Sequence, residues 1–241
     1  MARVLTIGGH DWSGRRGIEA DLRVFQAYGI WAFSALAGTG TLTEDITRSL
    51  KEGVDAVKIG RLESAEEAFA TAECLKAVPA PVVLHPRVPD AGKRGADALN
   101  ASVRQHILPL TTVLVLNTVS AERLVGFPVR DSVDMRRAAR TLGHLGAKAV
   151  LVTGGSRDQE ESARDCLWEQ GRERWLEAPW SRRRAATGKG AALSAAATAG
   201  LALGLSSAQA LDQAKKAVLE VLGNGPDIGW EASVIRLGQP Q

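Results

Sequence analysis

The sequence predicts an α/β protein in three layers, with a mostly parallel central sheet between two layers of helices. Short runs rich in Val, Ile and Leu alternate along the chain with longer helical patterns. The runs lack polar alternation, which is typical of strands buried on both faces. The length of 241 residues suits one domain with a large core. We therefore expect a single domain over residues 1–241, with ligands bound beyond the carboxyl ends of the strands.

Each element follows from its local pattern. The expected strands are short apolar runs, namely Val4–Ile7, Val54–Ile59, Val82–Leu84, Val113–Leu116 and Ala149–Val152. The expected helices carry apolar residues at spacings typical of a helix face, namely Ile18–Tyr28, Ala65–Lys76, Ala96–Ile107, Val133–Leu145, Ala191–Leu203 and Ala208–Leu222. The alternation stops late in the chain, where Ser162–Trp168 and Arg172–Leu176 flank a turn at Glu169-Gln170-Gly171. This stretch predicts a β-hairpin.

Charge, cysteine content and apolar runs exclude several classes of function. The net charge is only +3, which is too diffuse to indicate nucleic-acid binding. Cys74 and Cys166 lie far apart without metal-ligand spacing, so we expect neither a disulfide framework nor a zinc site. No run is long and apolar enough for a signal peptide or a membrane span. We expect a cytoplasmic protein whose partner is a small molecule, with no nucleic acid and no membrane.

A glycine turn that leads into a helix of small residues is the most informative stretch. Gly188-Lys189-Gly190-Ala191 precedes Ala192–Ala197. A helix that begins at such a turn presents free backbone N–H groups and the positive end of its dipole, which together favour an anion. The turn therefore predicts an anion hole at Gly188, Lys189, Gly190 and Ala191. The alternative is that the glycines only form a tight helix entry.

Eight segments that span nearly the whole chain form an ordered series. They are Leu5–Asp11, Ser13-Gly14, Gly17–Asp21, Asp55–Gly60, Pro81–Leu84, Leu108–Leu110, Leu142–Gly155 and Gly188–Ala196. In this order and spacing they resemble hydroxymethylpyrimidine and phosphomethylpyrimidine kinases of the ribokinase-like superfamily. The resemblance implies a ribokinase-like three-layer α/β/α sandwich, often a homodimer. It also implies transfer of the ATP γ-phosphate, assisted by Mg²⁺, to hydroxymethylpyrimidine or its phosphate in thiamin biosynthesis.

The resemblance assigns the glycine turn a catalytic base that this chain lacks. The family pattern there is Gly-Thr-Gly-Cys, whose last residue acts as base, and Ala191 stands at that position. Alanine cannot move a proton, and a positioned base contributes about 10²- to 10⁴-fold to rate. Candidate substitutes are Lys189 and Asp11.

The resemblance also implies a nucleotide and magnesium region, which has changed here. It comprises Asn117, Ser120, Thr153 and Gly155. The family pattern Asn-x-x-Glu ends in Ser120, and an Asp of the family is replaced by His85. Each change removes a carboxylate suited to Mg²⁺. Binding of ATP and magnesium is therefore expected to be weakened, and we predict no metal site built from the chain's own residues.

The residues that the resemblance places around the acceptor are Gly9, Arg16, Asp21, Thr39 and Arg61. Asp21 corresponds to the family's partner for the pyrimidine, and its alternative role is a helix cap or dipole partner. Arg61 replaces a Met of the family pattern, and Arg15-Arg16 replace Gly-Ala. Guanidinium groups at these positions favour a ligand that carries a phosphate.

The sequence leaves three functions open. The first is a phosphomethylpyrimidine kinase with weak or absent activity, because the base and the carboxylate of the magnesium motif are missing. The second is a non-catalytic binder or sensor of a phosphorylated pyrimidine or a pyridoxal-type ligand. The third is a scaffold whose role is an interface. Turnover of the Ala191→Cys variant would separate the first function from the others.

Overall fold

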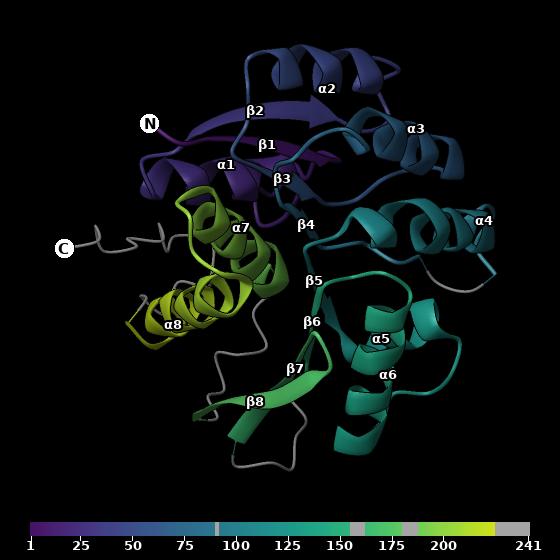
Figure 1. Ribbon diagram of the computed structural model, residues 1–241, viewed down its shortest axis with the longest axis vertical. Helices are drawn as coiled ribbons and strands as arrows, with labels where there is room; N and C mark the ends of the chain where they lie inside the picture. Colours follow the sequence, from purple (N-terminus) through teal and green to yellow (C-terminus); the bar gives the residue numbers. More distant parts are fainter. Residues whose placement is uncertain (90–91, 155–161, 180–187, 225–241) are drawn as a thin grey trace.

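The computed structural model describes residues 1–89, 92–154, 162–179 and 188–224 (Figure 1). The strands are β1 (Arg3–Gly8), β2 (Trp31–Leu36), β3 (Ala56–Ile59), β4 (Val82–Leu84), β5 (Val113–Asn117), β6 (Ala149–Thr153), β7 (Ser162–Glu169) and β8 (Arg172–Pro179). The α-helices are α1 (Gly17–Ala27), α2 (Leu42–Lys51), α3 (Ala65–Leu75), α4 (Ala96–Ser102), α5 (Thr118–Val125), α6 (Ser132–His144), α7 (Lys189–Ala202) and α8 (Ser207–Asn224). A π-helical segment, Val103–Ile107, continues α4.

The described strands form one sheet in the order β2-β1-β3-β4-β5-β6-β7-β8. Strands from β2 across to β6 pair in parallel, whereas β7 and β8 are antiparallel to their neighbours. The carboxyl ends of the parallel strands therefore meet at one edge. The loops after β1, β3, β4 and β5 gather at this edge, where open α/β sheets bind their ligands.

Helices cover both faces of the sheet, which confirms the predicted three layers (Figure 1). Successive strand residues point to opposite faces. Val113 and Val115 accordingly pack in the cluster that includes α1, α7 and α8. Leu114 and Leu116 pack in the cluster that includes α2 to α6. The edge formed by the carboxyl ends of the parallel strands lies between these two cores and contains a cavity.

One strand and two α-helices were not predicted, namely β2, α2 and α5. β2 lies at the end of the sheet, where Trp31 and Ser34 are exposed, so its sequence lacks a continuous apolar run. α2 buries only Leu42, Ile46 and Ser49. The predicted hairpin is confirmed as β7 and β8, and both strands run to later residues than predicted.

Helix α7 begins at Lys189 rather than at Ala191 as predicted. Gly188 is its N-cap residue with φ 97°, a left-handed conformation that favours glycine. Most of α7 is buried, and its small residues let α8 approach closely, since a Cβ at Gly200 would lie 3.0 Å from the Ala210 Cβ. Within the described part of the chain, no helix is long and apolar enough to cross a bilayer.

Candidate active site

A cavity of about 920 Å³ opens at the carboxyl edge of the parallel strands. Residues that follow β1, β3, β4 and β5 line it, together with the first turn of α7 and part of α8. Its volume lies in the range of small-ligand sites. The predicted anion-hole residues Gly188 to Ala191 all belong to this lining, as do Gly9, Asp11 and Asp21.

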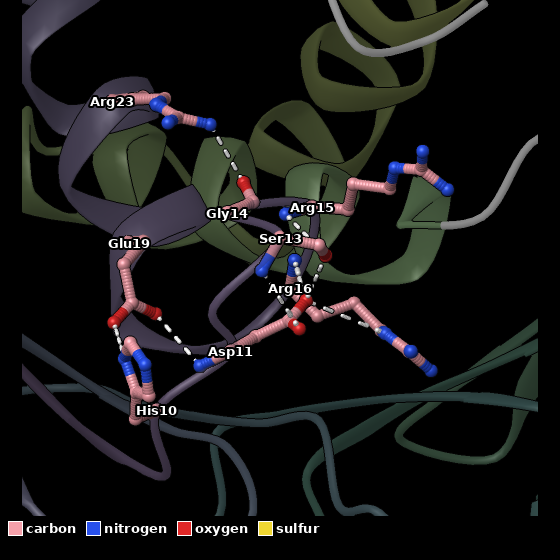
Figure 2. Close-up of polar contacts among 8 residues, drawn as sticks. All are labelled: His10, Asp11, Ser13, Gly14, Arg15, Arg16, Glu19 and Arg23. Carbon is pink, nitrogen blue, oxygen red and sulfur yellow. Dashed lines mark hydrogen bonds and ion pairs between the residues drawn. The ribbon is translucent and has the colours of Figure 1, made fainter.

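The loop between β1 and α1 is held by its own side chains and by Glu19 of α1 (Figure 2). Asp11 Oδ2 accepts hydrogen bonds from Ser13 Oγ at 2.9 Å and from the Arg16 backbone N–H at 2.9 Å. The Asp11 N–H donates to Glu19 Oε2 at 3.1 Å, while Glu19 Oε1 pairs with His10 Nδ1. These contacts make the loop a fixed wall of the cavity.

Asp11 is therefore engaged as a structural acceptor. Burial alone would raise the pKa of its carboxyl, but hydrogen bonds from Ser13 and Arg16 outweigh burial and lower the pKa. A carboxylate with a lowered pKa is a weaker proton acceptor. Lys189 lines the cavity from the first turn of α7. Its ammonium form would add positive charge there, and only the neutral amine could accept a proton.

A buried ion pair lies at the floor of the cavity. Lys58 Nζ contacts Asp21 Oδ2 at 2.7 Å, and the two side chains are only 3% and 2% exposed. Thr6 Oγ1 donates to the same Oδ2 atom at 2.7 Å. Asp21 is thus a cavity residue and not a helix cap, since the N-cap of α1 is Arg16. Its other oxygen, Oδ1, is buried without a hydrogen-bond partner among the described residues.

The arginines predicted around the acceptor differ in position. Arg16 and Arg61 line the cavity, whereas Arg15 is not part of the lining. Arg16 Nε lies 3.7 Å from Asp11 Oδ2, and Arg61 forms an ion pair with Glu63. Thr39 does not reach the cavity, because its hydroxyl donates to the Leu36 carbonyl at 2.8 Å in the exposed loop after β2.

The first turn of α7 carries the most direct departure from the family pattern. Ala191 lines the cavity and is 5% exposed, so its methyl group occupies the position that the resemblance assigns to the base. Gly190 faces the ring of His85, because a Cβ at Gly190 would lie 2.6 Å from His85 Cε1 and 2.8 Å from Nε2. A side chain at position 190 and the observed ring could not coexist.

The predicted nucleotide and magnesium region is brought to the same cavity in part. Asn117, Ser120 and Thr153 line it, and Gly155 lies outside the described residues. Asn117 Oδ1 accepts the Ser120 N–H at 2.8 Å as the cap of α5. Glu122 Oε2 accepts the Val129 N–H at 3.0 Å and is therefore engaged outside this motif.

These residues do not fit a magnesium ion held by the protein. The amide oxygen of Asn117 is engaged in a helix cap, and imidazole and guanidinium groups from His85 and Arg87 line the neighbouring wall. Mg²⁺ prefers carboxylate, phosphate and water oxygens. Among the described residues no group of three or more His, Cys, Asp or Glu side chains could hold a metal ion.

Basic side chains dominate the cavity. Within the described part of the chain, nine Lys and Arg residues and four carboxylates line it. Lys58 was not predicted as a site residue, although a lysine within the apolar strand Ala56–Ile59 indicates a buried polar role. Asp165 and Lys215 were not predicted either, and their side chains pair at 3.1 Å where α8 borders the cavity.

Comparison with known proteins decides the family. The family model described as phosphomethylpyrimidine kinase matches residues 11–235. The chain belongs to this family. Among the relatives, a hydroxymethylpyrimidine/phosphomethylpyrimidine kinase of Streptomyces coelicolor is 35% identical over 94% of both chains. A putative pyridoxine kinase of Treponema pallidum is 34% identical over 93% of both chains.

A solved structure extends the likeness to three dimensions. The pyridoxal kinase from Staphylococcus aureus, in complex with AMP-PCP and pyridoxal, superposes with a TM-score of 0.85 at 26% identity, covering 95% of this chain and 91% of that one. The ribokinase-like α/β fold and the membership of this vitamin-kinase family are therefore confirmed.

Proposed function

We propose that this protein is a phosphomethylpyrimidine-type kinase of low activity, which binds a nucleotide's terminal phosphate and a hydroxymethyl acceptor in the 920 Å³ cavity. The composition and position of the first turn of α7 support this function most directly. Its residues line the cavity, with the glycine backbone suited to an anion, while Ala191 offers only a methyl group. Binding is thus retained and proton transfer at this position is lost.

Asp21 supports the binding of a ring acceptor. Its Oδ1 atom is buried without a hydrogen-bond partner among the described residues, and such an atom is costly unless a ligand donates to it. An amino group on a pyrimidine ring would satisfy it. Arg16 and Arg61 lie on the same lining and would hold a phosphate on that acceptor.

The phosphoryl donor, the metal ion, the pathway and the oligomeric state are inferred from the family. ATP would be the phosphoryl donor, as the AMP-PCP complex of the S. aureus relative suggests. Magnesium would enter on the phosphates, because the described residues offer it few oxygen ligands. The pathway would be thiamin metabolism, and the protein would form a homodimer, which sedimentation velocity tests.

Product formation tests the function. Purified protein is incubated for hours with ATP and Mg²⁺ and either hydroxymethylpyrimidine, its phosphate or pyridoxal, and products are measured by mass spectrometry. We expect slow phosphorylation of a pyrimidine above the no-enzyme control. The absence of product with all three acceptors, in a sample that melts cooperatively, would contradict a kinase.

A non-catalytic binder is the second candidate, and the charge of the cavity favours it. The described lining residues include nine basic residues and four carboxylates. This positive charge suits a phosphorylated pyrimidine or a pyridoxal-type phosphate. A binder would take up such a ligand, measured by calorimetry, and show no turnover in the product assay.

A further inference from the structure

His85 is a fixed side chain of the cavity that the proposed function does not yet use. It directly follows β4, and its Nδ1 lies 2.8 Å from the carbonyl oxygen of Val115 on the neighbouring strand β5. A carbonyl oxygen only accepts hydrogen bonds, so Nδ1 carries the proton and Nε2 of the neutral ring carries a lone pair. The strand contact thus sets both the orientation and the tautomer of the ring.

The Nε2 edge of this ring lies against the first turn of α7. A Cβ at Gly190 would be 2.8 Å from Nε2 and 2.6 Å from Cε1, so glycine at position 190 is what admits the ring. Ala191 is the next residue, and its methyl group can neither donate to nor accept from the ring. The basic nitrogen of His85 therefore lies beside the turn at which the family pattern has its base.

The surroundings of His85 keep the ring neutral. Burial lowers its pKa, Lys58 from β3 lowers it further, and the contacts with Val115 and with Asp21 from α1 oppose these effects, giving a pKa of about 4. The positive end of α7, with Lys189 in its first turn, faces the same part of the cavity. A weak but unprotonated base suits slow turnover.

We propose that His85 Nε2 accepts the hydroxyl proton of the phosphoryl acceptor, the task that the family pattern gives to position 191. This inference rests on the proposed kinase function. The acceptor oxygen forms a bond to the γ-phosphorus of ATP while the bond from that phosphorus to the bridging oxygen breaks, and ADP leaves with the electron pair. The hydroxyl proton passes to Nε2, and the imidazolium then returns it to solvent.

Nitrogen NMR of the full chain with labelled histidine tests the contact without requiring turnover. The chain has four histidines, and loss of one signal in His85→Asn assigns the resonance. Hydroxymethylpyrimidine should shift the His85 Nε2 signal toward the protonated form, because its hydroxyl group donates to the lone pair. The same pyrimidine with a methyl in place of the hydroxymethyl group is the matched control and should leave the signal in place.

Kinetics test the proton transfer. Asparagine at position 85 has an amide N–H that can still donate to the Val115 carbonyl, but it lacks the basic nitrogen. We expect His85→Asn to lower kcat by about 10²- to 10⁴-fold with little change in acceptor KM. His106→Asn, in the π-helical segment outside the cavity lining, is the control and should retain wild-type kcat.

The outcomes separate the inference from the proposed function. A hydroxyl-dependent NMR shift together with the kcat loss supports His85. If His85→Asn forms product at the wild-type rate, or if the His85 Nε2 signal shifts equally with both pyrimidines, His85 is not the base. The proposed kinase function is not affected by either result. A wild-type protein that makes no product overturns both, even if the hydroxyl-dependent shift is present. Failure to bind the pyrimidine overturns the inference as well.

Discussion

At the scale of single residues, the Lys58 and Asp21 pair shows how a polar contact is maintained inside an apolar layer. Both side chains are almost fully buried, and Nζ and Oδ2 lie 2.7 Å apart. Removing one partner leaves a buried charge alone, which costs about 3–5 kcal/mol. We predict that Asp21→Asn lowers the free energy of unfolding by this amount in denaturant titrations. Glu173→Gln, which breaks the more exposed pair with Arg140, should cost at most about 1 kcal/mol.

His85 makes stability depend on pH. Its pKa of about 4 in the folded protein lies below the ordinary value of 6.5, chiefly through burial and then through Lys58. The unfolded chain therefore takes up the proton first as pH falls. This contribution, about 3 kcal/mol, is complete above the ordinary pKa and is lost as pH falls toward the folded-state value. We predict that His85→Asn flattens the stability curve between about pH 6.5 and pH 4, and an unchanged slope would contradict this account.

Single site residues could be predicted from the sequence where they belong to a motif of the family. The resemblance identified Asp21, Ala191 and Arg61, and all three line the cavity. Thr39 was assigned by its place in the pattern alone, and the structure turns its hydroxyl to the Leu36 carbonyl. The contact of His85 with Gly190 depends on bringing β4 beside α7, which no local pattern encodes.

At the scale of elements, the first turn of α7 must accommodate the ring of His85. A methyl group at position 190 would lie 2.6 Å from the ring and would have to displace it. We predict that Gly190→Ala destabilises the protein by about 1–3 kcal/mol and also weakens ligand binding, because the displaced ring enters the cavity.

Gly143→Ala is the matched control for that variant. Its Cβ would lie 2.1 Å from the ring of Trp168, between α6 and β7 and outside the cavity lining. It should lower the melting temperature while ligand affinity, measured below that temperature, is retained. Loss of affinity in both variants would show that packing in general, rather than His85, controls the site.

The ends of three helices could be predicted closely from the sequence. α1, α3 and α6 were expected within a residue or so of their observed ends, because their apolar positions repeat with the helical period. α5 is only 8 residues long, and its cap is made by Asn117, which the motif had assigned to the nucleotide. A short capped helix is fixed by its tertiary contacts rather than by periodicity.

At the scale of the whole molecule, the sheet gathers basic groups that are scattered in the sequence. The net charge is +3, yet basic residues exceed carboxylates by nine to four in the described lining of one cavity. We predict that affinity for hydroxymethylpyrimidine phosphate falls as NaCl rises from about 0.05 M to about 0.5 M, since salt screens the attraction. Hydroxymethylpyrimidine without phosphate is the control, and calorimetry should show little salt dependence for it.

The Ala191→Cys variant tests whether the cavity binds its substrates but lacks a base at position 191. A thiol at the start of α7 would have a lowered pKa and accept a proton, whereas Ala191→Ser has nearly the same size and a far less acidic hydroxyl. Mass-spectrometric turnover of hydroxymethylpyrimidine should rise at least about tenfold over wild type in Ala191→Cys and stay near wild type in Ala191→Ser. A folded Ala191→Cys protein that turns over no faster than wild type would contradict the account.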